Sequence, residues 1–239
     1  KESWNAELHT LTSVEKIILN ACTNPSKAVV VTGGEPLQYN LNLLKQFTKL
    51  FSECEFEYLL NLSSDTVYGQ SLEEINDDTP ISPDSLNGIM QATKEMVLDE
   101  VFKNKVGHLR STMVFGPGDT HNGYGPNRFI RQALSGHPIE IFGEGIEKRE
   151  HIYIDDVINI ADVMVTLRIT DRLIASSGDL VTFVDIASNT IKYLEQGSIK
   201  YLDSKQKSSL VRKFSSKKIK QVLPDFKPTT TENGIKKLI

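Results

Sequence analysis

The stretch from residue 56 to residue 69 constrains the fold more than any other part of the sequence. Residues 56–62 (FEYLLNL) form a short, mostly apolar run that does not alternate, which predicts a strand buried on both faces. Residues 63–69 (SSDTVYG) then bring hydroxyls, a carboxylate and a glycine to the place where that strand would end. Ligands of open parallel sheets bind outside the carboxyl ends of the strands, so this cluster is a candidate active site. The simpler interpretation is a Ser/Asp turn that caps the strand, and the Ser-Ser-Asp tripeptide alone favours it.

Strands and helices are expected to alternate on both sides of this stretch. Residues 28–32 (AVVVT) are rich in β-branched side chains and predict a buried strand, and residues 41–51 predict a helix. A second helix is expected to begin at Ser82-Pro83, with serine as N-cap and proline at the first helical position. Its apolar face comprises Leu86, Ile89, Met90, Met96, Val97 and Val101. With a further strand at residues 108–115, this order predicts an α/β fold with a parallel sheet.

The second half of the chain differs from the first in its density of turn residues and in its shorter elements. Residues 116–127 are dense in glycine, proline and asparagine and predict a long loop. A strand at residues 139–142, a helix capped by Asp155 or Asp156, a helix starting at Thr182 and a strand at residues 199–202 follow. They indicate a smaller α+β lobe that is interleaved with the sheet.

Composition excludes several classes of function. The formal net charge of −4, from 27 basic and 31 acidic residues, gives no reason to expect binding to nucleic acid or to an anionic membrane. No apolar run approaches the roughly 20 residues of a membrane helix. Two cysteines and five scattered histidines match neither a disulfide framework nor metal-ligand spacing, so we expect no metal and a cytoplasmic location.

Four motifs in order resemble one known family. They are residues 62–69 (LSSDTVYG), residues 110–117 (RSTMVFGP), the pair 142–145 (FGEG) and 149–157 (REHIYIDDV), and the closing segment 214–239. Together they resemble the NAD-dependent epimerase/dehydratase family, extended short-chain dehydrogenases/reductases that act on nucleotide sugars. The resemblance implies a Rossmann-like parallel sheet, NAD as cofactor (with NADP not excluded), a nucleotide sugar as ligand and a homodimer as one oligomeric state.

The resemblance also implies a domain division. Residues 1–121 and 152–176 would form a partial NAD-binding Rossmann domain, and residues 122–151 and 177–239 would form the substrate-binding lobe. The family's glycine-rich GxxGxxG turn, which holds the dinucleotide pyrophosphate, has no match in this sequence. About two βα units are therefore expected to be missing, through an incomplete sequence or, alternatively, a shortened protein.

The helix after Ser82-Pro83 departs from the family at its catalytic positions. The family pattern is Tyr-x-x-x-Lys, and Gly88 and Glu95 fix a register that puts Asn87 at the tyrosine and Gln91 at the lysine. The chemistry needs a phenol whose pKa is lowered from about 10 by a neighbouring ammonium, which asparagine and glutamine do not provide. Lys94, three positions beyond Gln91, is expected to face solvent.

Other family positions are better matched. Ser64 would hydrogen-bond the sugar oxygen that is oxidised, and Asp65 is either the general acid of sugar 4,6-dehydratases or part of an Asx-turn. Thr66 stands where those dehydratases have glutamate, which weakens a dehydratase reading. Arg149 resembles the arginine that binds the nucleotide pyrophosphate. The implied cofactor-binding residues are Gly33, Ser63, Asn87, Gln91 and Thr112, and the implied substrate-binding residues are Thr66, Asn127, Arg128 and Arg149.

Three functional hypotheses follow. In the first, the chain belongs to an enzyme that acts by transient hydride transfer on the sugar. In the second, it is a non-catalytic relative that binds nucleotide sugar and NAD with a degenerate site at Asn87 and Gln91. In the third, the mechanism has shifted and Asp65 is the base.

Overall fold

The computed structural model describes residues 28–31, 48–49, 52, 55–69, 74–119, 122–203, 211–215 and 217–239. Residues 48 and 49, within the expected helix at 41–51, are helical, while the rest of that helix lies outside the described residues. Gly33 also lies outside them.

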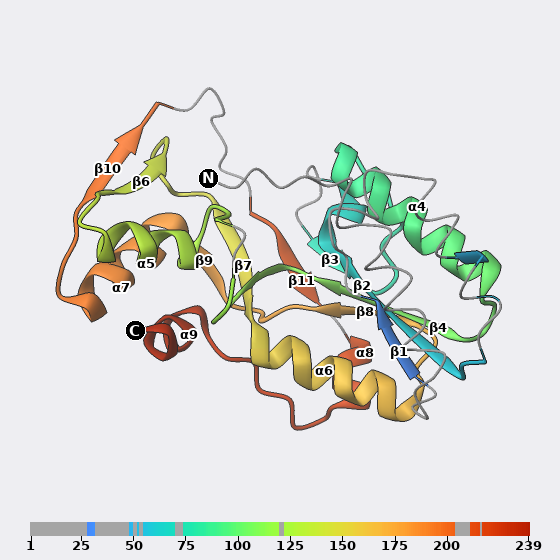
Figure 1. The fold of residues 1–239 in the computed structure, drawn as a ribbon. Helices are drawn as coiled ribbons and strands as arrows, with labels where there is room; N and C mark the ends of the chain where they lie inside the picture. Colours follow the sequence, from blue (N-terminus) through green and yellow to red (C-terminus); the bar gives the residue numbers. More distant parts are fainter. Residues whose placement is uncertain are drawn as a thin grey trace. The chain divides into compact units, whose positions relative to one another are not determined.

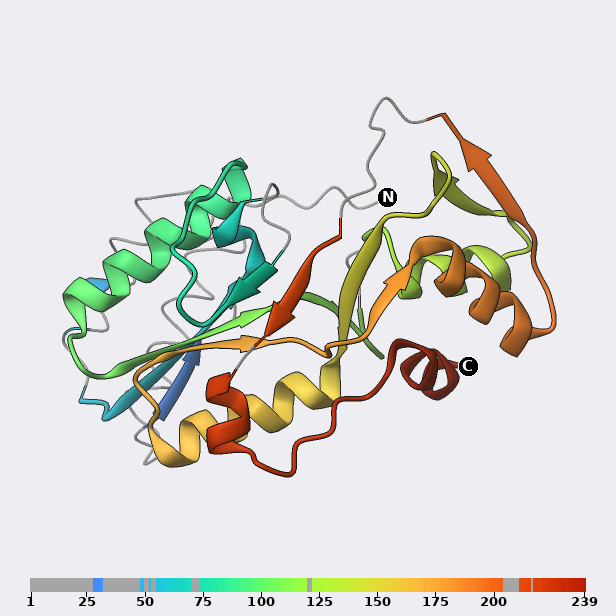
Figure 2. The same cartoon turned by 180° about the vertical axis from the view of Figure 1, so that it is seen from behind.

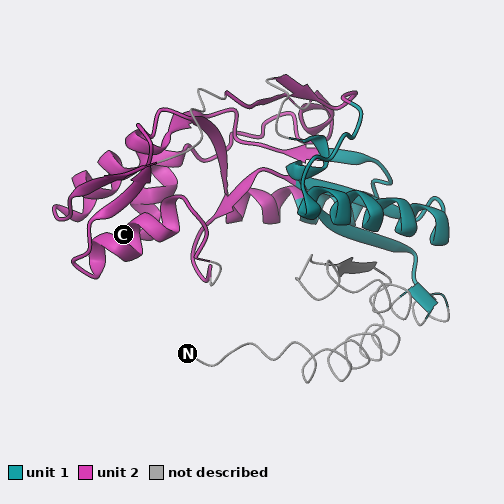
Figure 3. Ribbon diagram, turned by 90° about the horizontal axis from the view of Figure 1, so that it is seen from above, with its two compact units in different colours: residues 1–70, 80–110, 161–173 teal, residues 71–79, 111–160, 174–239 magenta. Residues whose placement is uncertain are grey.

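The chain divides into two compact units (Figure 3). Unit 1 comprises residues 1–70, 80–110 and 161–173, and unit 2 comprises residues 71–79, 111–160 and 174–239. The expected cofactor and substrate domains are defined by what they bind, so their boundaries stay a prediction.

Unit 1 holds most of a four-stranded sheet in the order β1-β2-β4-β8 (Figure 1). Its strands are β1 (Ala28–Val31), β2 (Tyr58–Ser64), β4 (Val106–Ser111) and β8 (Arg172–Ala175). β1 and β2 pair in parallel, and the first four residues of β2 are buried. The buried strand is confirmed, although it runs two residues further than expected, and the structure is α/β as predicted.

The 3-10 helix η1 (Asp65–Tyr68) follows β2, and helix α4 (Leu86–Val101) packs against both (Figures 1 and 2). The prediction that Ser82 caps α4 is wrong. The N-cap is Ser85, whose side chain accepts a hydrogen bond from the Gly88 backbone nitrogen at 3.1 Å. The backbone nitrogen of Ser82 instead donates to the Val67 carbonyl at 2.9 Å, so that the segment before the helix is held on η1.

Four of the six residues in the predicted apolar stripe of α4 are exposed, while Met90 and Val97 are half-buried. Leu86, Ile89, Met96 and Val101 are 65%, 48%, 56% and 43% exposed. The buried side of the helix is mainly small or polar, and consists of Gly88, Gln91, Ala92, Lys94, Glu95 and Leu98. Polar contacts rather than an apolar seam therefore join this helix to the sheet.

The described residues of unit 2 form three small sheets, whose strands can be followed in Figure 2. β5 (Met113–Phe115), β7 (Lys148–Tyr153) and β9 (Leu180–Thr182) form one, in which β5–β7 is parallel and β7–β9 antiparallel. β6 (Ile139–Phe142) pairs in parallel with β10 (Ile199–Leu202), and β3 (Glu74–Asn76) pairs in parallel with β11 (Lys213–Ser215). The strands expected at 139–142 and 199–202 are confirmed.

Helices of unit 2 close its apolar core. α5 (Pro126–Leu134) lies beside α7 (Phe183–Leu194), which contacts α9 (Thr231–Leu238) (Figures 1 and 2). The core comprises Phe129, Ile130, Ala133, Ile139, Ile141, Phe183, Ile186, Ala187 and Ile235. As predicted, α7 begins after Thr182, which forms a capping box with Asp185.

Two further helices complete the described residues, α6 (Ile154–Leu167) and α8 (Lys217–Val222). The prediction that Asp155 or Asp156 caps α6 is wrong, because the helix begins at Ile154 and both aspartates lie in its first turn. In the part of the chain that the structure describes, none of the helices combines the length and apolarity needed to cross a membrane.

Candidate functional site

The hydroxyl of Ser64 lies at the end of β2, where the sequence predicts a site. It is the N-cap of η1, accepting hydrogen bonds from the backbone nitrogen and the hydroxyl of Thr66 at 3.2 and 3.1 Å. It donates to the Asp65 carboxylate at 3.3 Å. The three side chains are half-buried, and the capping turn that the sequence suggested does form. The donor and both acceptor positions of this hydroxyl are used within the turn, so a ligand that binds Ser64 would replace one of these bonds.

The start of α4 is held directly against η1. A Cβ on Gly88 would lie 2.3 Å from the Thr66 carbonyl oxygen, so only glycine permits this approach. Asn87, beside Gly88, is exposed, whereas Gln91, one turn later, is 5% exposed. The buried Oε1 of Gln91 has no protein hydrogen-bond partner. The structure thus brings the Ser64 turn and the first turns of α4 together within unit 1.

A buried ion pair fixes the rotation of α4. The Glu95 carboxylate accepts from Nε and Nη2 of Arg110 at 3.0 and 2.5 Å, and from the Ser63 hydroxyl at 2.6 Å. Arg110 also donates to the Tyr68 hydroxyl at 2.8 Å. Burial raises the pKa of Glu95, but the hydrogen bonds and charge of Arg110 outweigh it and leave that pKa below its ordinary value. The Ser63 hydroxyl therefore faces this network, and a cofactor contact by Ser63 would use its backbone.

The expectation that Lys94 faces solvent is wrong. Its side chain is 2% exposed, and its ammonium donates to the Leu62 carbonyl at 3.0 Å. Burial lowers the pKa of Lys94 to about 8, and the charge of Glu95 opposes that shift only in part. The long aliphatic stem of lysine reaches back under the strand that carries Ser64. Hydrophobic periodicity gives no signal for this placement.

Asn127 ties the substrate-loop region to the end of β5. Its side-chain nitrogen donates to the Gly116 carbonyl at 2.7 Å, and its side-chain oxygen accepts from the Gly116 nitrogen at 3.1 Å. A Cβ on Gly116 would lie 2.3 Å from Cγ2 of Ile154. The amide of Asn127 thus has a structural role in holding the start of α5.

Arg149 lies on β7, whose neighbouring side chains alternate between two faces. On one face, the buried Glu150 carboxylate accepts from the backbone nitrogens of Phe214 and Gly178 at 2.7 and 2.9 Å and so anchors the strand. On the other, Nε of Arg149 donates to Oε1 of Glu147 at 2.5 Å. The strand that carries the Arg149 guanidinium is therefore held in place by the bonds of Glu150.

Arg128, on α5, is also paired within unit 2. Its Nη2 lies 3.4 Å from Oε2 of Glu140. Of the remaining predicted residues, Thr112 is 4% exposed and its hydroxyl oxygen is buried without a protein partner.

His151 lies on the same face of β7 as Arg149 and is 1% exposed. Its ring meets Phe115 and Phe183 edge-on, with centroid separations of 6.3 and 5.9 Å. Neither ring nitrogen has a protein hydrogen-bond partner. Burial, and secondarily the charge of Arg149, lowers the pKa of His151 to about 3, so the ring is neutral near pH 7.

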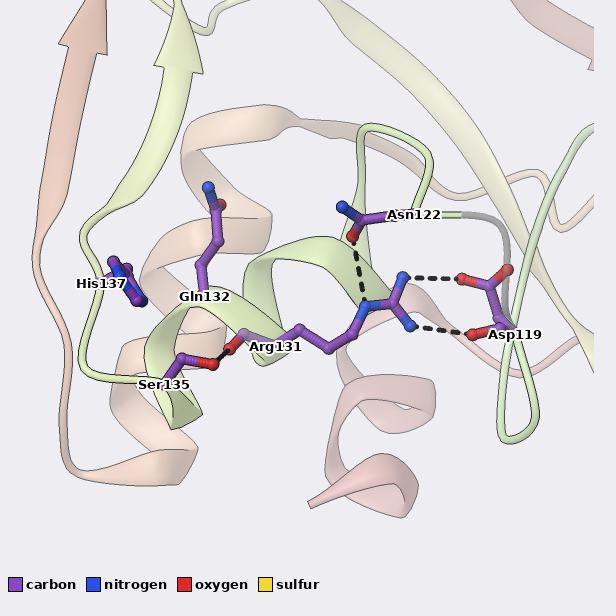
Figure 4. Close-up of a pocket in the computed structure, with 6 residues that line it drawn as sticks. All are labelled: Asp119, Asn122, Arg131, Gln132, Ser135 and His137. Atoms are coloured by element: carbon purple, nitrogen blue, oxygen red, sulfur yellow. Dashed lines mark hydrogen bonds and ion pairs between the residues drawn. The ribbon is translucent and has the colours of Figure 1, made fainter. Parts of the chain in front are cut away.

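A surface cavity of about 540 Å³ lies elsewhere in unit 2 (Figure 4). It is lined by Asp119, Asn122, Arg131, Gln132, Ser135 and His137. The Arg131 guanidinium is already bonded to Asp119 and Asn122. None of the predicted site residues lines this cavity, and these bonds occupy the Arg131 guanidinium within the protein.

The predicted residues thus fall into two groups. Ser63, Ser64, Asp65, Thr66, Asn87 and Gln91 belong to unit 1, and Thr112, Asn127, Arg128 and Arg149 belong to unit 2.

Curated relatives match only parts of the chain. The uncharacterized UDP-glucose epimerase YtcB of Bacillus subtilis is 29% identical over 124 residues, which are 50% of this chain and 39% of that protein. The 7-carboxy-7-deazaguanine synthase of Flavobacterium psychrophilum is 51% identical over 49 residues, which are 20% of this chain and 23% of that protein. The chain therefore spans less than half the length of either relative.

Solved structures extend the likeness over the fold. The structure of MoeE5 in complex with UDP-glucose and NAD superposes with a TM-score of 0.79 at 20% identity, covering 93% of this chain and 80% of that one. The expected Rossmann-like architecture is confirmed by this likeness.

The sequence pattern of one family accounts for most of the chain. The NAD dependent epimerase/dehydratase family matches residues 17–172, well over half of the 239 residues. The chain belongs to the NAD dependent epimerase/dehydratase family.

Proposed function

We propose that this chain is part of a protein that binds a nucleotide sugar and NAD, and that lacks the family's proton-transfer pair. The observation that carries the proposal is the buried network of Glu95 with Arg110 and Ser63. It supports the register in which Asn87 and Gln91 stand at the tyrosine and lysine positions. Neither side chain ionises near neutral pH, so neither takes a proton from a sugar hydroxyl.

Residues of both units support the binding part of the proposal. In unit 1, the half-exposed Ser64 hydroxyl would hold the sugar oxygen. In unit 2, Arg149 carries a planar fork of N–H donors, which suits bidentate contact with a diphosphate. The relative solved with UDP-glucose and NAD makes a uridine diphosphate sugar the first ligand to test.

The described residues fit NAD in part. Gln91 has a buried side-chain oxygen without a partner, and such an oxygen suits a ribose hydroxyl donor. The glycine-rich turn that would hold the pyrophosphate has no match in this sequence. NAD, when bound, supplies a hydride acceptor, and in unit 1 Gln91 would contact it.

The test combines binding with a single turnover. Calorimetry should detect UDP-glucose binding to the protein that contains this chain, while mixing an excess of that protein and NAD with UDP-glucose should give no absorbance rise at 340 nm. Formation of NADH at a rate typical of enzymes, on the order of 1 s⁻¹ or faster, would refute the loss of chemistry.

One contact favours a second candidate, a working enzyme with a shifted base. The Ser64 hydroxyl donates to the Asp65 carboxylate, so Asp65 is placed to accept a proton through Ser64. If NADH does form, Asp65→Asn should abolish it and leave UDP-glucose binding intact. Persistence of turnover in that variant would exclude Asp65 as the base.

A further inference from the structure

The guanidinium of Arg149 is occupied by a carboxylate of the same chain. Glu147 precedes Arg149 by two residues, and this spacing in an extended segment puts both side chains on one face. Nε of Arg149 donates to Oε1 of Glu147 at 2.5 Å, and Nη2 contacts the same oxygen. The two side chains are 17% and 26% exposed, so water and salt screen the pair less than a surface pair.

The backbone that carries this pair is anchored independently. Glu150 holds β7 from the opposite face through its bonds to Phe214 and Gly178. Before the strand, the Gly145 carbonyl accepts from the Val184 nitrogen at 3.2 Å. A ligand that binds the Arg149 guanidinium would therefore displace the Glu147 side chain and leave the strand in place.

Arg128, the other arginine of unit 2 expected to bind substrate, is also paired with a carboxylate. Arg128 pairs with Glu140 at 3.4 Å, a longer and weaker contact than that of Arg149. Each of these two arginines is thus paired with one carboxylate of the same chain.

We propose that Glu147 is a specificity-determining residue that limits the affinity of this site for nucleotide diphosphates. Its carboxylate takes the position on Arg149 that a ligand phosphate would take, and each binding event exchanges one anion for the other. The inference rests on the proposed function, because it assigns Arg149 to the diphosphate of a nucleotide sugar.

The test replaces the charge of Glu147 and keeps its shape. Glu147→Gln removes the anion, and Glu144→Gln is the matched control, because Glu144 is an exposed carboxylate three residues earlier in the adjoining turn. The first readout needs no ligand: the rate at which phenylglyoxal modifies Arg149, followed by peptide mass mapping. The second is the dissociation constant of UDP-glucose by calorimetry.

We expect faster modification of Arg149 in Glu147→Gln alone, and UDP-glucose affinity increased by roughly tenfold, the scale of a partly buried ion pair. An unchanged modification rate overturns the inference. So does weaker UDP-glucose binding in Glu147→Gln, since Glu147 would then orient Arg149 rather than compete for it. Faster modification of Arg149 with no UDP-glucose binding to any of the three proteins would support the pairing of Glu147 with Arg149. It would refute the proposed nucleotide-sugar function.

Discussion

The substitution His151→Phe should change how stability depends on pH. In the folded chain the pKa of His151 is lowered to about 3, first by burial and then by the charge of Arg149, whereas an unfolded histidine titrates near 6.5. The unfolded state therefore binds more protons between these values. Stability contributed by the neutral ring is complete above pH 6.5 and is lost as the pH falls.

The magnitude follows from linkage. Between pH 7 and pH 5 this one group should remove about 2 kcal/mol from the free energy of unfolding. Any folded pKa below about 4 gives nearly the same loss, because the folded ring stays neutral throughout this range. Phenylalanine does not titrate, so the variant should lack this component.

The assay is urea unfolding, followed by circular dichroism, at pH 7 and pH 5. Comparing the two proteins cancels shared titrations, such as that of Glu150, whose raised pKa acts in the opposite direction. Phenylalanine is larger and Gly125 is close by, 3.4 Å from Nε2 of His151 to a Cβ built there, so stability at pH 7 can shift either way. The expected difference between the two proteins is therefore in how the free energy of unfolding changes with pH.

A matched control for the change of side chain is His137→Phe, which removes an exposed ring instead of the buried one. If the parent and His151→Phe lose stability in parallel from pH 7 to pH 5, His151 is not a buried neutral group and the argument is refuted.

Three further predictions concern the site and its support. Arg149→Ala should weaken UDP-glucose binding by roughly 1.5–3 kcal/mol with little effect on folding; parent-like affinity by calorimetry would remove Arg149 from the site. Asn87→Tyr with Gln91→Lys should raise NADH formation at 340 nm by roughly 10²–10⁴-fold, with neither single change sufficient; equal turnover by the parent would contradict a disabled site. From pH 7 to pH 9.5, the parent should gain about 2 kcal/mol of stability relative to Lys94→Met, because the folded pKa of Lys94 is about 8 against 10.5; a constant difference would mean that Lys94 is solvated.

The parts of the fold that the sequence predicted depend on local patterns. The buried strand β2 was predictable from a continuous apolar run, and the start of α7 from the Thr182 capping box. The N-cap of α4 was not, because Ser82 and Ser85 are both plausible caps. The choice depends on the bond from Ser82 to Val67, a contact that no local pattern predicts.

The orientation of α4 shows a deeper limit. Apolar residues at helical spacing predict a stripe, but they do not say whether that stripe faces the sheet. Here the inward side carries Glu95 and Lys94, because a distant arginine and a strand carbonyl satisfy them. Family motifs indicated the register through Glu95, whereas hydrophobic periodicity alone pointed to the wrong face.

The network of Glu95, Arg110 and Ser63 supports the end of β2, whereas the residues at the positions of the proton-transfer pair lie elsewhere on α4. Glu95 holds Arg110 and Ser63 with short bonds, so the end of β2 keeps its geometry whatever occupies the positions of Asn87 and Gln91. A buried charged network collapses if one partner is lost, since the other is left without compensation. Surface or cleft positions such as Asn87 carry no such penalty. The proposed loss of the proton-transfer pair would therefore be compatible with a retained fold, and the double substitution tests it on a network that is already formed.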